Sequence, residues 1–459
     1  MVVRHLRLLL LAVLAGCTLA EPPDDTVILA EALPETTTIP PVWATEDVTT
    51  VEAGGSWVAS FQDPELDALV REALANNRDL QAAAARVQAA LQTVNIAGAP
   101  ILPSVSLGGG TQYSHNSQLN DAYHVSGGAL EVTWEVDIWG KLRSGQAAAA
   151  AIAAATESEA EYARQSIAAT VARLWITNIE IAQLIALAQT AIDDYTLLVD
   201  LTREKEIGGQ VSTFDVVQVE GRLKAALSVQ NQLQARANEV IAALEVLLGR
   251  YPSLTLVPAK EFPRMPDELS AGLPLSLLDR RPDVTAARSQ VIAAFYNVEV
   301  AKLARLPGVT LAAAGGRLFD PSLALIDTDP FFFRIGAGLL QPIFEGGALE
   351  AQVAEMTAEQ AAATAEYGQT VLTAFGEVES LMANERLLRQ GLADWQASYA
   401  DAEEALRLGN YQYLAGAIDM VSLITVIEFS LGRQLDVIES EAALLRNRIS
   451  LNLALGESY

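Results

Sequence analysis

Two runs of alternating apolar and polar residues lie in the first half of the chain, over about residues 102–114 and 124–137. The larger side chains of the first run are Val105, Leu107, Thr111 and Tyr113, with Ser, Gly or Gln between them. The apolar positions of the second run are Leu130, Val132, Trp134 and Val136, with small or acidic residues between them. This alternation is typical of membrane-spanning β-strands that have one lipid-facing side. A water-soluble hairpin with one face on a core alternates in the same way, so both interpretations are open at this point.

A very long helical pattern follows these two runs. Residues 141–207 contain no proline, and the pattern resumes over 212–248 after a pair of glycines. A helix of about 65 residues spans about 100 Å and needs partners along its whole length. Alanine dominates these segments, which allows helices to approach closely. We therefore expect a pair of long helices over about residues 140–248.

The chain repeats this organisation about 204 residues later. Leu102-Pro103 recurs as Leu306-Pro307, and Leu248-Gly249 recurs as Leu455-Gly456 at a slightly larger offset. The repeat predicts strands at about 308–320 and 331–344 and long helices over about 346–455. Residues 56–255 then form the first structural repeat and residues 256–459 the second. A duplicated unit of helix, β-hairpin and long helix pair predicts pseudo-symmetry, and such units suggest a closed tube.

The N-terminus has the pattern of a secretory signal peptide at residues 1–16, in which Arg4 and Arg7 precede the apolar run 8–14. This segment ends in Leu-Ala-Gly before Cys17, which resembles the lipobox of bacterial lipoproteins. Cys17 is the only cysteine in the chain, so an intramolecular disulfide is excluded. An ordinary signal peptide with an incidental cysteine is the alternative. Residues 17–55 are rich in Pro, Thr and acids and predict an extended, lipidated arm.

Charge and residue types narrow the function. A net charge of -27 makes nucleic acid an unfavourable partner. Downstream of the signal peptide the histidines are His115 and His124, which we expect on an external loop. No His-based triad, HExxH motif or phosphate-binding loop is present. We therefore predict no enzymatic activity, no cofactor and no metal site. After the signal peptide no stretch of about 18 uninterrupted apolar residues occurs, so a membrane span is expected as strands.

Four short motifs give the chain a resemblance to a known family. They are Trp134-Glu135-Val136-Asp137-Ile138-Trp139-Gly140, Arg281-Pro282-Asp283-Val284, Pro342-Ile343-Phe344-Glu345-Gly346-Gly347 and Gly416-Ala417-Ile418-Asp419. In this order, and with this duplication, they resemble the TolC-like outer-membrane efflux family, especially its lipid-anchored OprM/NodT-like branch. The resemblance extends from about Trp57 to Gly456.

This resemblance implies a mainly α-helical protein with a transmembrane β-barrel. Four strands from each chain of a homotrimer would form a twelve-stranded barrel in the outer membrane, and the long helices would form a periplasmic α-helical barrel. The implied partners are a periplasmic adaptor and an inner-membrane pump of the RND type, as well as outer-membrane lipid. The implied function is an exit duct for drugs or other toxic small molecules. A duct for type I protein secretion is the neighbouring alternative. A periplasmic coiled-coil adaptor is a third, but it predicts a single helical hairpin and no strands of membrane length.

The resemblance also suggests two groups of site residues. The turns of the two helix pairs would form the periplasmic gate and the surface that docks the adaptor: Gly208, Gly209, Ser212, Asp215, Tyr413, Gly416 and Asp419. The alternatives are structural, because Asp is a favoured helix cap and Gly adopts the positive φ of a tight turn. The second group lies where the barrel meets the helices, and we expect it to have a structural role: Trp134, Asp137, Trp139, Gly140, Pro342 and Gly346.

Changing Cys17 to Ser tests the lipoprotein interpretation. Because a hydroxyl group cannot form the thioether of a lipoprotein, labelled palmitate should enter the wild-type protein and not the Cys17→Ser variant. Ser212→Ala serves as a matched control that leaves the lipobox intact. Equal palmitate incorporation into both variants would contradict the interpretation.

Overall fold

The computed structural model describes residues 19–44, 56–116, 121–266, 272–319, 331–457 and 459. The expected signal peptide, Cys17 and residues 45–55 of the arm lie outside these residues, as does the turn-rich segment 320–330. The chain divides into two compact units. Unit 1 comprises residues 1–37, 85–159 and 283–370, and unit 2 comprises residues 38–84, 160–282 and 371–459.

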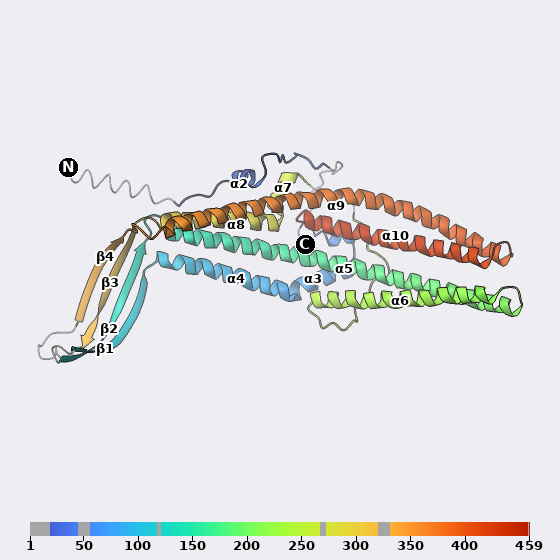
Figure 1. Ribbon diagram of the computed structural model, residues 1–459, viewed down its shortest axis with the longest axis horizontal. Helices are drawn as coiled ribbons and strands as arrows, with labels where there is room; N and C mark the ends of the chain where they lie inside the picture. Colours follow the sequence, from blue (N-terminus) through green and yellow to red (C-terminus); the bar gives the residue numbers. More distant parts are fainter. Residues whose placement is uncertain (1–18, 45–55, 117–120, 267–271, 320–330, 458) are drawn as a thin grey trace. The chain divides into compact units, whose positions relative to one another are not determined.

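The helices and strands are labelled in Figure 1. In chain order they are α2 (Asp25–Ala32), η1 (Ala59–Phe61), α3 (Pro64–Asn76), α4 (Arg78–Gly98), η2 (Ala99–Ile101), β1 (Ser104–Asn116), β2 (Asp121–Val136), α5 (Lys141–Ile207), α6 (Thr213–Leu247), α7 (Pro274–Arg280), α8 (Pro282–Leu303), β3 (Gly308–Phe319), β4 (Phe331–Leu340), α9 (Ala348–Leu414) and α10 (Met420–Ala454).

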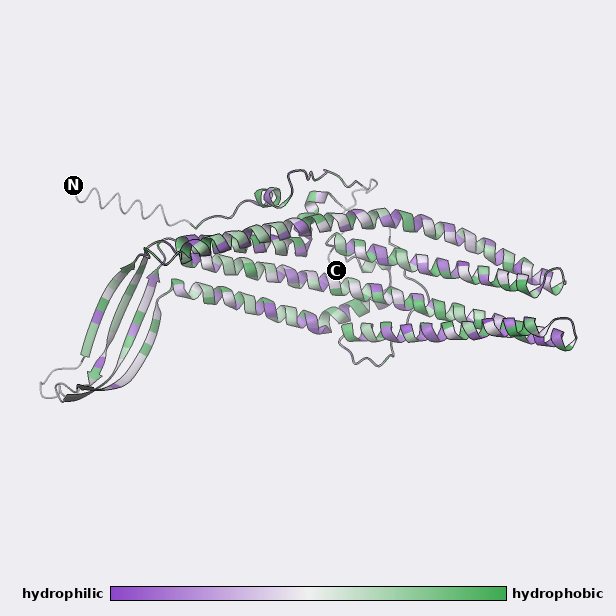
Figure 2. Cartoon of the chain, viewed as in Figure 1, coloured by the Kyte–Doolittle hydropathy of each residue, from purple (hydrophilic) through white to green (hydrophobic). Residues whose placement is uncertain are grey.

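Unit 1 contains an antiparallel four-stranded sheet in the order β1-β2-β3-β4. The register brings most of the large apolar residues of the four strands onto one face, where Leu107 pairs with Leu130 and Leu311 pairs with Trp134 and Ala337. Figure 2 shows apolar and polar residues following one another along these strands. The alternation predicted from the sequence is therefore confirmed in the described strands.

The apolar face of this sheet is uncovered in the single chain. The exposed fractions are 81% for Leu107, 74% for Ile335 and 72% for Leu339. A water-soluble hairpin would bury such a face against a core. An exposed apolar face is instead typical of strands that contact lipid.

Two expectations for the strands are wrong in detail. His115 and His124 lie within β1 and β2, paired with Ala122 and Tyr113, and not on a loop. The fourth strand ends at Leu340 and not near residue 344. Pro342 has no N–H to donate to a ladder, which explains why the pairing stops just before it.

The change of repeat offset lies between the third and fourth strands. β3 and α8 begin 204 positions after β1 and α4, whereas α9 and α10 begin 207 positions after α5 and α6. Ser104 of β1 pairs with Thr133, and its counterpart Gly308 pairs with Leu340, so the offset is already 207 at β4. The long helices have equal lengths in both repeats, at 67 and 35 residues.

One stretch of α5 is apolar enough to span a membrane by length and composition alone. Its 18-residue window has a mean hydropathy of 1.3, and 61% of that window is buried inside the protein. This degree of burial is typical of a helix in a protein core, because a lipid-facing helix would expose these side chains.

Unit 2 contains a core formed by helices that lie far apart in the sequence. Trp175 on α5 is 1% exposed, and its Nε1–H donates to Asp63 Oδ2 at 2.8 Å. Oδ1 of Asp63 accepts the N–H groups of Glu65 and Leu66, so the same carboxylate caps α3. The other large side chains of this core include Trp57, Phe61, Leu66, Leu69, Ile176, Ile179, Leu244, Leu248, Leu445 and Ile449.

The two long helix pairs end in the same way within unit 2. Gly249 and Gly456 both have positive φ, and a Cβ would lie 2.8 Å from the carbonyl oxygen of Asn76 and 2.7 Å from that of Arg280, respectively. Beside these glycines, Asn77 donates to the carbonyl oxygen of Leu247, and Arg281 donates to that of Ala454. The duplicated Leu-Gly pairs in the sequence thus mark positions that admit no side chain.

The N-terminal arm is not wholly extended as expected, because Asp25–Ala32 forms the short helix α2. Ile28 on this helix is 2% exposed, and Asp25 forms an ion pair with Arg288 at 2.7 Å. Gly368 on α9 faces the end of α2 so closely that a Cβ would collide with the carbonyl oxygen of Ala32. The sequence did not reveal this helix because its stability comes from docking and not from its own periodicity.

Replacing Gly368 with Ala should displace α2. Alanine favours a helix interior by about 1 kcal/mol over glycine, but here its methyl group would collide with the arm. Gly376→Ala is the matched control, because the space beside Gly376 on the same helix is open. Limited proteolysis of residues 19–44 should be faster in Gly368→Ala and unchanged in Gly376→Ala. Equal protection in both variants would contradict this account of α2 docking.

Candidate functional site at the helix-pair tips

The turn between α5 and α6 closes with a left-handed glycine. Gly209 has φ +68°, and the N–H of Gln210 donates to the carbonyl oxygen of Lys205 at 2.9 Å. The N–H of Gly209 donates to Glu206 at 2.8 Å. These two bonds satisfy the last carbonyls of α5 in the manner of a Schellman motif, which needs glycine at its left-handed position.

The turn between α9 and α10 has the same geometry. Gly416 has φ +72°, and its N–H donates to the carbonyl oxygen of Tyr413 at 3.0 Å. The N–H of Ala417 donates to Gln412 at 2.8 Å. The duplicated glycines Gly209 and Gly416 are therefore explained by the turns themselves.

Serine and aspartate exchange places between the two tips. At the first tip Asp215 accepts both the N–H and the hydroxyl of Ser212, at 2.9 and 2.8 Å. At the second tip Asp419 occupies the N-cap position and accepts the N–H of Ser422 at 2.9 Å. Each helix thus begins with one carboxylate and one hydroxyl, in opposite order.

These hydrogen bonds favour the ionised form of both carboxylates. The backbone N–H and then the hydroxyl of Ser212 hold the pKa of Asp215 below its ordinary value, while the negative charge of Asp419 acts in the opposite direction. The hydroxyl and backbone N–H of Ser422 likewise lower the pKa of Asp419. Both tips therefore carry negative charge at neutral pH.

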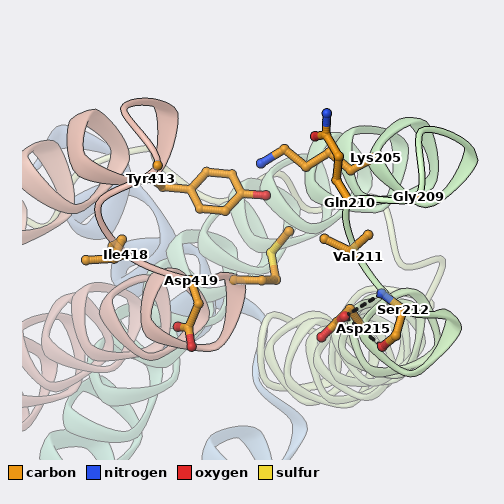
Figure 3. Close-up of a pocket in the computed structure, with 11 residues that line it drawn as sticks. Lys205, Gly209, Gln210, Val211, Ser212, Asp215, Tyr413, Ile418 and Asp419 are labelled. Atoms are coloured by element: carbon orange, nitrogen blue, oxygen red, sulfur yellow. Dashed lines mark hydrogen bonds between the residues drawn. The ribbon is translucent and has the colours of Figure 1, made fainter.

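A cavity of about 510 Å³ lies between the two tips. Tyr413 lines it, is 7% exposed, and belongs to an apolar cluster with Met420 and Val219. Lys205 Nζ lies 4.0 Å from the centre of the Tyr413 ring, a cation–π contact that connects the first helix pair to the second. Figure 3 shows Lys205 extending toward this ring, with Ser212 and Asp215 joined by hydrogen bonds.

The structure brings most of the expected tip residues together. Gly209, Ser212, Asp215, Tyr413, Gly416 and Asp419 all line the cavity. Gly208 lies in the same turn but does not line it. Five further residues line the cavity that were not among the expected gate residues: Lys205, Gln210, Val211, Ile418 and Met420. Lys205 in the last turn of α5 was a detectable signal, because cations are favoured at helix C-termini.

The residues of the barrel-to-helix connection form a second cluster, which lies in unit 1. Asp137 accepts the backbone N–H groups of Leu142 and Arg143 at 3.1 and 3.0 Å, and so caps the start of α5. Trp134 and Trp139 donate their Nε1–H groups to the carbonyl oxygens of Ile101 and Pro307. Gly140 and Gly346 have positive φ, and Pro342 follows the end of β4. These contacts support the structural role proposed for this group.

The described residues contain no group of three or more His, Cys, Asp and Glu side chains placed to hold a metal ion. What the tips offer is a charged, hydrogen-bonded surface and a hydrophobic contact between helix pairs.

Comparison with known proteins decides the family. The model of the family described as outer membrane efflux protein matches residues 69–250 and 273–457. This chain belongs to the outer membrane efflux protein family.

Relatives within the outer membrane efflux protein family match most of the chain. The pyoverdine export outer membrane protein OpmQ of Pseudomonas aeruginosa is 31% identical over 424 residues, covering 88% of this chain and 87% of that protein. The probable efflux pump outer membrane protein TtgC of Pseudomonas putida is 27% identical over 455 residues, covering 97% and 94%.

Solved structures show the same fold. The outer-membrane channel OprN matches with a TM-score of 0.83 and 23% identity, covering 93% of this chain and 99% of that one. VceC from Vibrio cholerae matches with a TM-score of 0.81 and 24% identity, covering 87% and 98%. The chain therefore shares the fold of these outer-membrane proteins, with a large helical part, and belongs to a family of outer membrane efflux proteins.

The capping at the first tip predicts a pH-dependent stability. A lowered folded-state pKa means that ionised Asp215 stabilises the tip above the unfolded value of about 3.9, and that this stability is lost as pH falls through the lower folded value. Ser212→Ala removes one donor and should raise the pKa of Asp215. The exchange rates at the start of α6 are corrected for the intrinsic pH dependence of exchange. As the pH is lowered, they should begin to rise at a higher pH in Ser212→Ala than in wild type.

Ser228→Ala is the matched control, because Ser228 is exposed in the middle of the same helix. It should leave exchange at the start of α6 unchanged. If Ser212→Ala behaves like Ser228→Ala, the hydrogen bonds of Ser212 do not stabilise this tip.

Proposed function

We propose that three copies of this chain form the exit duct of a tripartite efflux system. In this proposal a twelve-stranded barrel crosses the outer membrane, a helical barrel extends into the periplasm, and Cys17 carries a lipid anchor. A periplasmic adaptor and an inner-membrane pump of the RND type would deliver the cargo and the energy. The duct itself would carry out no chemistry.

The sheet of unit 1 carries this proposal. Among the described strands β1 pairs only with β2, and β4 pairs only with β3, so both outer edges lack a partner within the chain. In the hydrocarbon of a membrane every backbone N–H and C=O must be bonded, which requires a closed sheet. Pairing β1 of one copy with β4 of the next satisfies both edges.

The number of strands supports three copies. Two copies would give eight strands, and a barrel of about eight strands has an interior that its own side chains fill. Twelve strands leave a water-filled lumen, which suits the small and polar residues on the second face of the sheet. Three copies of the duplicated unit also place six similar helix pairs around one axis.

The cargo is proposed from the relatives. One is named for pyoverdine export, and others are named for efflux of antibiotics or toluene. These are small molecules, so we assign small toxic or secreted compounds as the cargo class. No described feature favours type I protein secretion, and the two long helix pairs and the sheet do not match the single hairpin expected of an adaptor.

The tips are the proposed gate and adaptor-docking surface. Large apolar side chains surround the two turns in an exposed position: Ile207 at 89%, Phe214 at 71% and Leu414 at 79%. Exposed apolar residues next to ionised carboxylates are suited to a partner with apolar contacts and basic side chains.

The mass and shape of the mature protein in mild detergent test the proposal directly. Light scattering should give a mass of three chains, and negative-stain images should show a tube longer than about 100 Å. A monomer that stays soluble without detergent would contradict the membrane barrel.

Removing the charge of Asp419 tests the gate. Asparagine is also a good N-cap, so Asp419→Asn removes charge and keeps the cap, whereas Asp419→Ala removes both. Both variants should change single-channel conductance or its dependence on cations, and only Asp419→Ala should increase hydrogen exchange at the start of α10. Unchanged conductance in both would exclude Asp419 from the gate.

A further inference from the structure

The second face of the sheet carries mostly small side chains, a few charged ones, and larger apolar residues such as Leu318, Phe332 and Leu340. The register places Ser106, Ala129, Ala312, Ala314 and Gly336 on this face. Among the strand residues whose side chains the structure describes, the charged residues on it are Glu131, Glu135 and Arg334. Glu135 forms an ion pair with Lys141 of α5 at 2.6 Å, at the end of the sheet that joins the helix. Glu131 and Arg334 lie further along the strands.

Glu131 and Arg334 form an ion pair that crosses an intervening strand. Glu131 on β2 pairs in register with Ala314 on β3, and Ala314 pairs with Arg334 on β4. The two charged side chains meet above Ala314, with Arg334 Nη2 3.5 Å from Glu131 Oε1. Ala314 is 5% exposed, which is unusual on this open face. A side chain larger than alanine at position 314 would separate the pair.

We infer that Glu131 and Arg334 form a girdle of alternating charge in the lumen of the barrel and determine which charged solutes enter it. This inference rests on the proposed closure of three chains. Glu131 and Arg334 are two strands apart, which is about 10 Å around the wall. In a twelve-stranded ring the Glu131 of the next copy again lies two strands beyond Arg334, so that six charges alternate in sign.

Most neighbours of the two charged residues on this face are small, such as Ser106, Ala314 and Gly336, and the larger neighbour is Phe332 on β4. Glu131 and Arg334 are 51% and 73% exposed on the open face. A solute passing this level meets both signs of charge at close range, as in other pores with charged rings. The two charges offset each other. Removing the charge of Arg334 should therefore make the lumen favour cations, and removing the charge of Glu131 should make it favour anions.

Charged thiol reagents test the local field, whatever the state of the tips. The natural chain has a single cysteine, Cys17, so the Glu131→Cys variant introduces one new thiol into the sheet. In intact cells this thiol should react with water-soluble reagents, and the anionic reagent should be favoured by Arg334. Adding Arg334→Gln should lower the anionic-to-cationic rate ratio by a factor of about two to five, the range for one partly exposed charge pair.

Two controls use the opposite face of the same sheet. Arg317 lies on the apolar face, paired in register with Gly128, so Arg317→Gln in the Glu131→Cys background should leave the rate ratio unchanged. Leu130→Cys, also on the apolar face, should resist both reagents. If Arg317→Gln lowers the ratio as much as Arg334→Gln does, the effect is one of general charge and the girdle is excluded.

Ion selectivity of the purified channel gives a second measurement. Arg334→Gln should shift the permeability ratio toward cations and Glu131→Gln toward anions, while the double variant should lie close to wild type. Conducting trimers with unchanged ratios and unchanged thiol reactivity would overturn the girdle and leave the proposed duct intact. A protein that forms no trimer in detergent would overturn both.

Discussion

The hydrogen-bonding demand of a sheet edge in lipid is the constraint on which the rest of this molecule depends. Among the described strands, β1 and β4 form the two outer edges of the sheet, and neither edge pairs with a further strand. Water would satisfy such edges in a soluble protein, and hydrocarbon cannot. A sheet of this kind in a membrane has to be closed, and this demand is the basis of the proposed assembly of several copies.

The parts of the fold that have a regular period were readable from the sequence. A strand alternates every two residues and a long helix lacks breakers, so the ends of α5 and β3 were predicted almost to the residue. Features that depend on contacts distant in the sequence were not. The α2 helix is stabilised by its docking beside Gly368, and Lys205 meets Tyr413 across 208 positions. Neither contact has a local sequence pattern, so the burial of Tyr413, which is 7% exposed, could not be predicted from the sequence.

The two repeats conserve geometry more strictly than chemistry. Gly249 and Gly456 are the same residue because a neighbouring carbonyl oxygen leaves no room for a side chain. Asn77 and Arg281 occupy equivalent positions in the two repeats. The amide of Asn77 donates to the last turn of α6, and the guanidinium of Arg281 donates to the last turn of α10. The tips exchange serine and aspartate while each keeps a capped helix. A hydrogen bond that caps a helix can be made by several residue types. A position where a Cβ would collide with a neighbouring carbonyl oxygen accepts only glycine.

The three additional residues between β3 and β4 indicate where this architecture tolerates a change in chain length. Within a helix, three inserted residues would rotate everything that follows by about 60° relative to its former face, and 67 residues of α9 would lose their packing partners. Placed between two strands, the same residues leave β4 paired with β3 in the register that β2 has with β1. A change in the length of this connection is therefore not transmitted to the rotation of the helices. This connection and the helical part can have diverged in sequence length independently of each other.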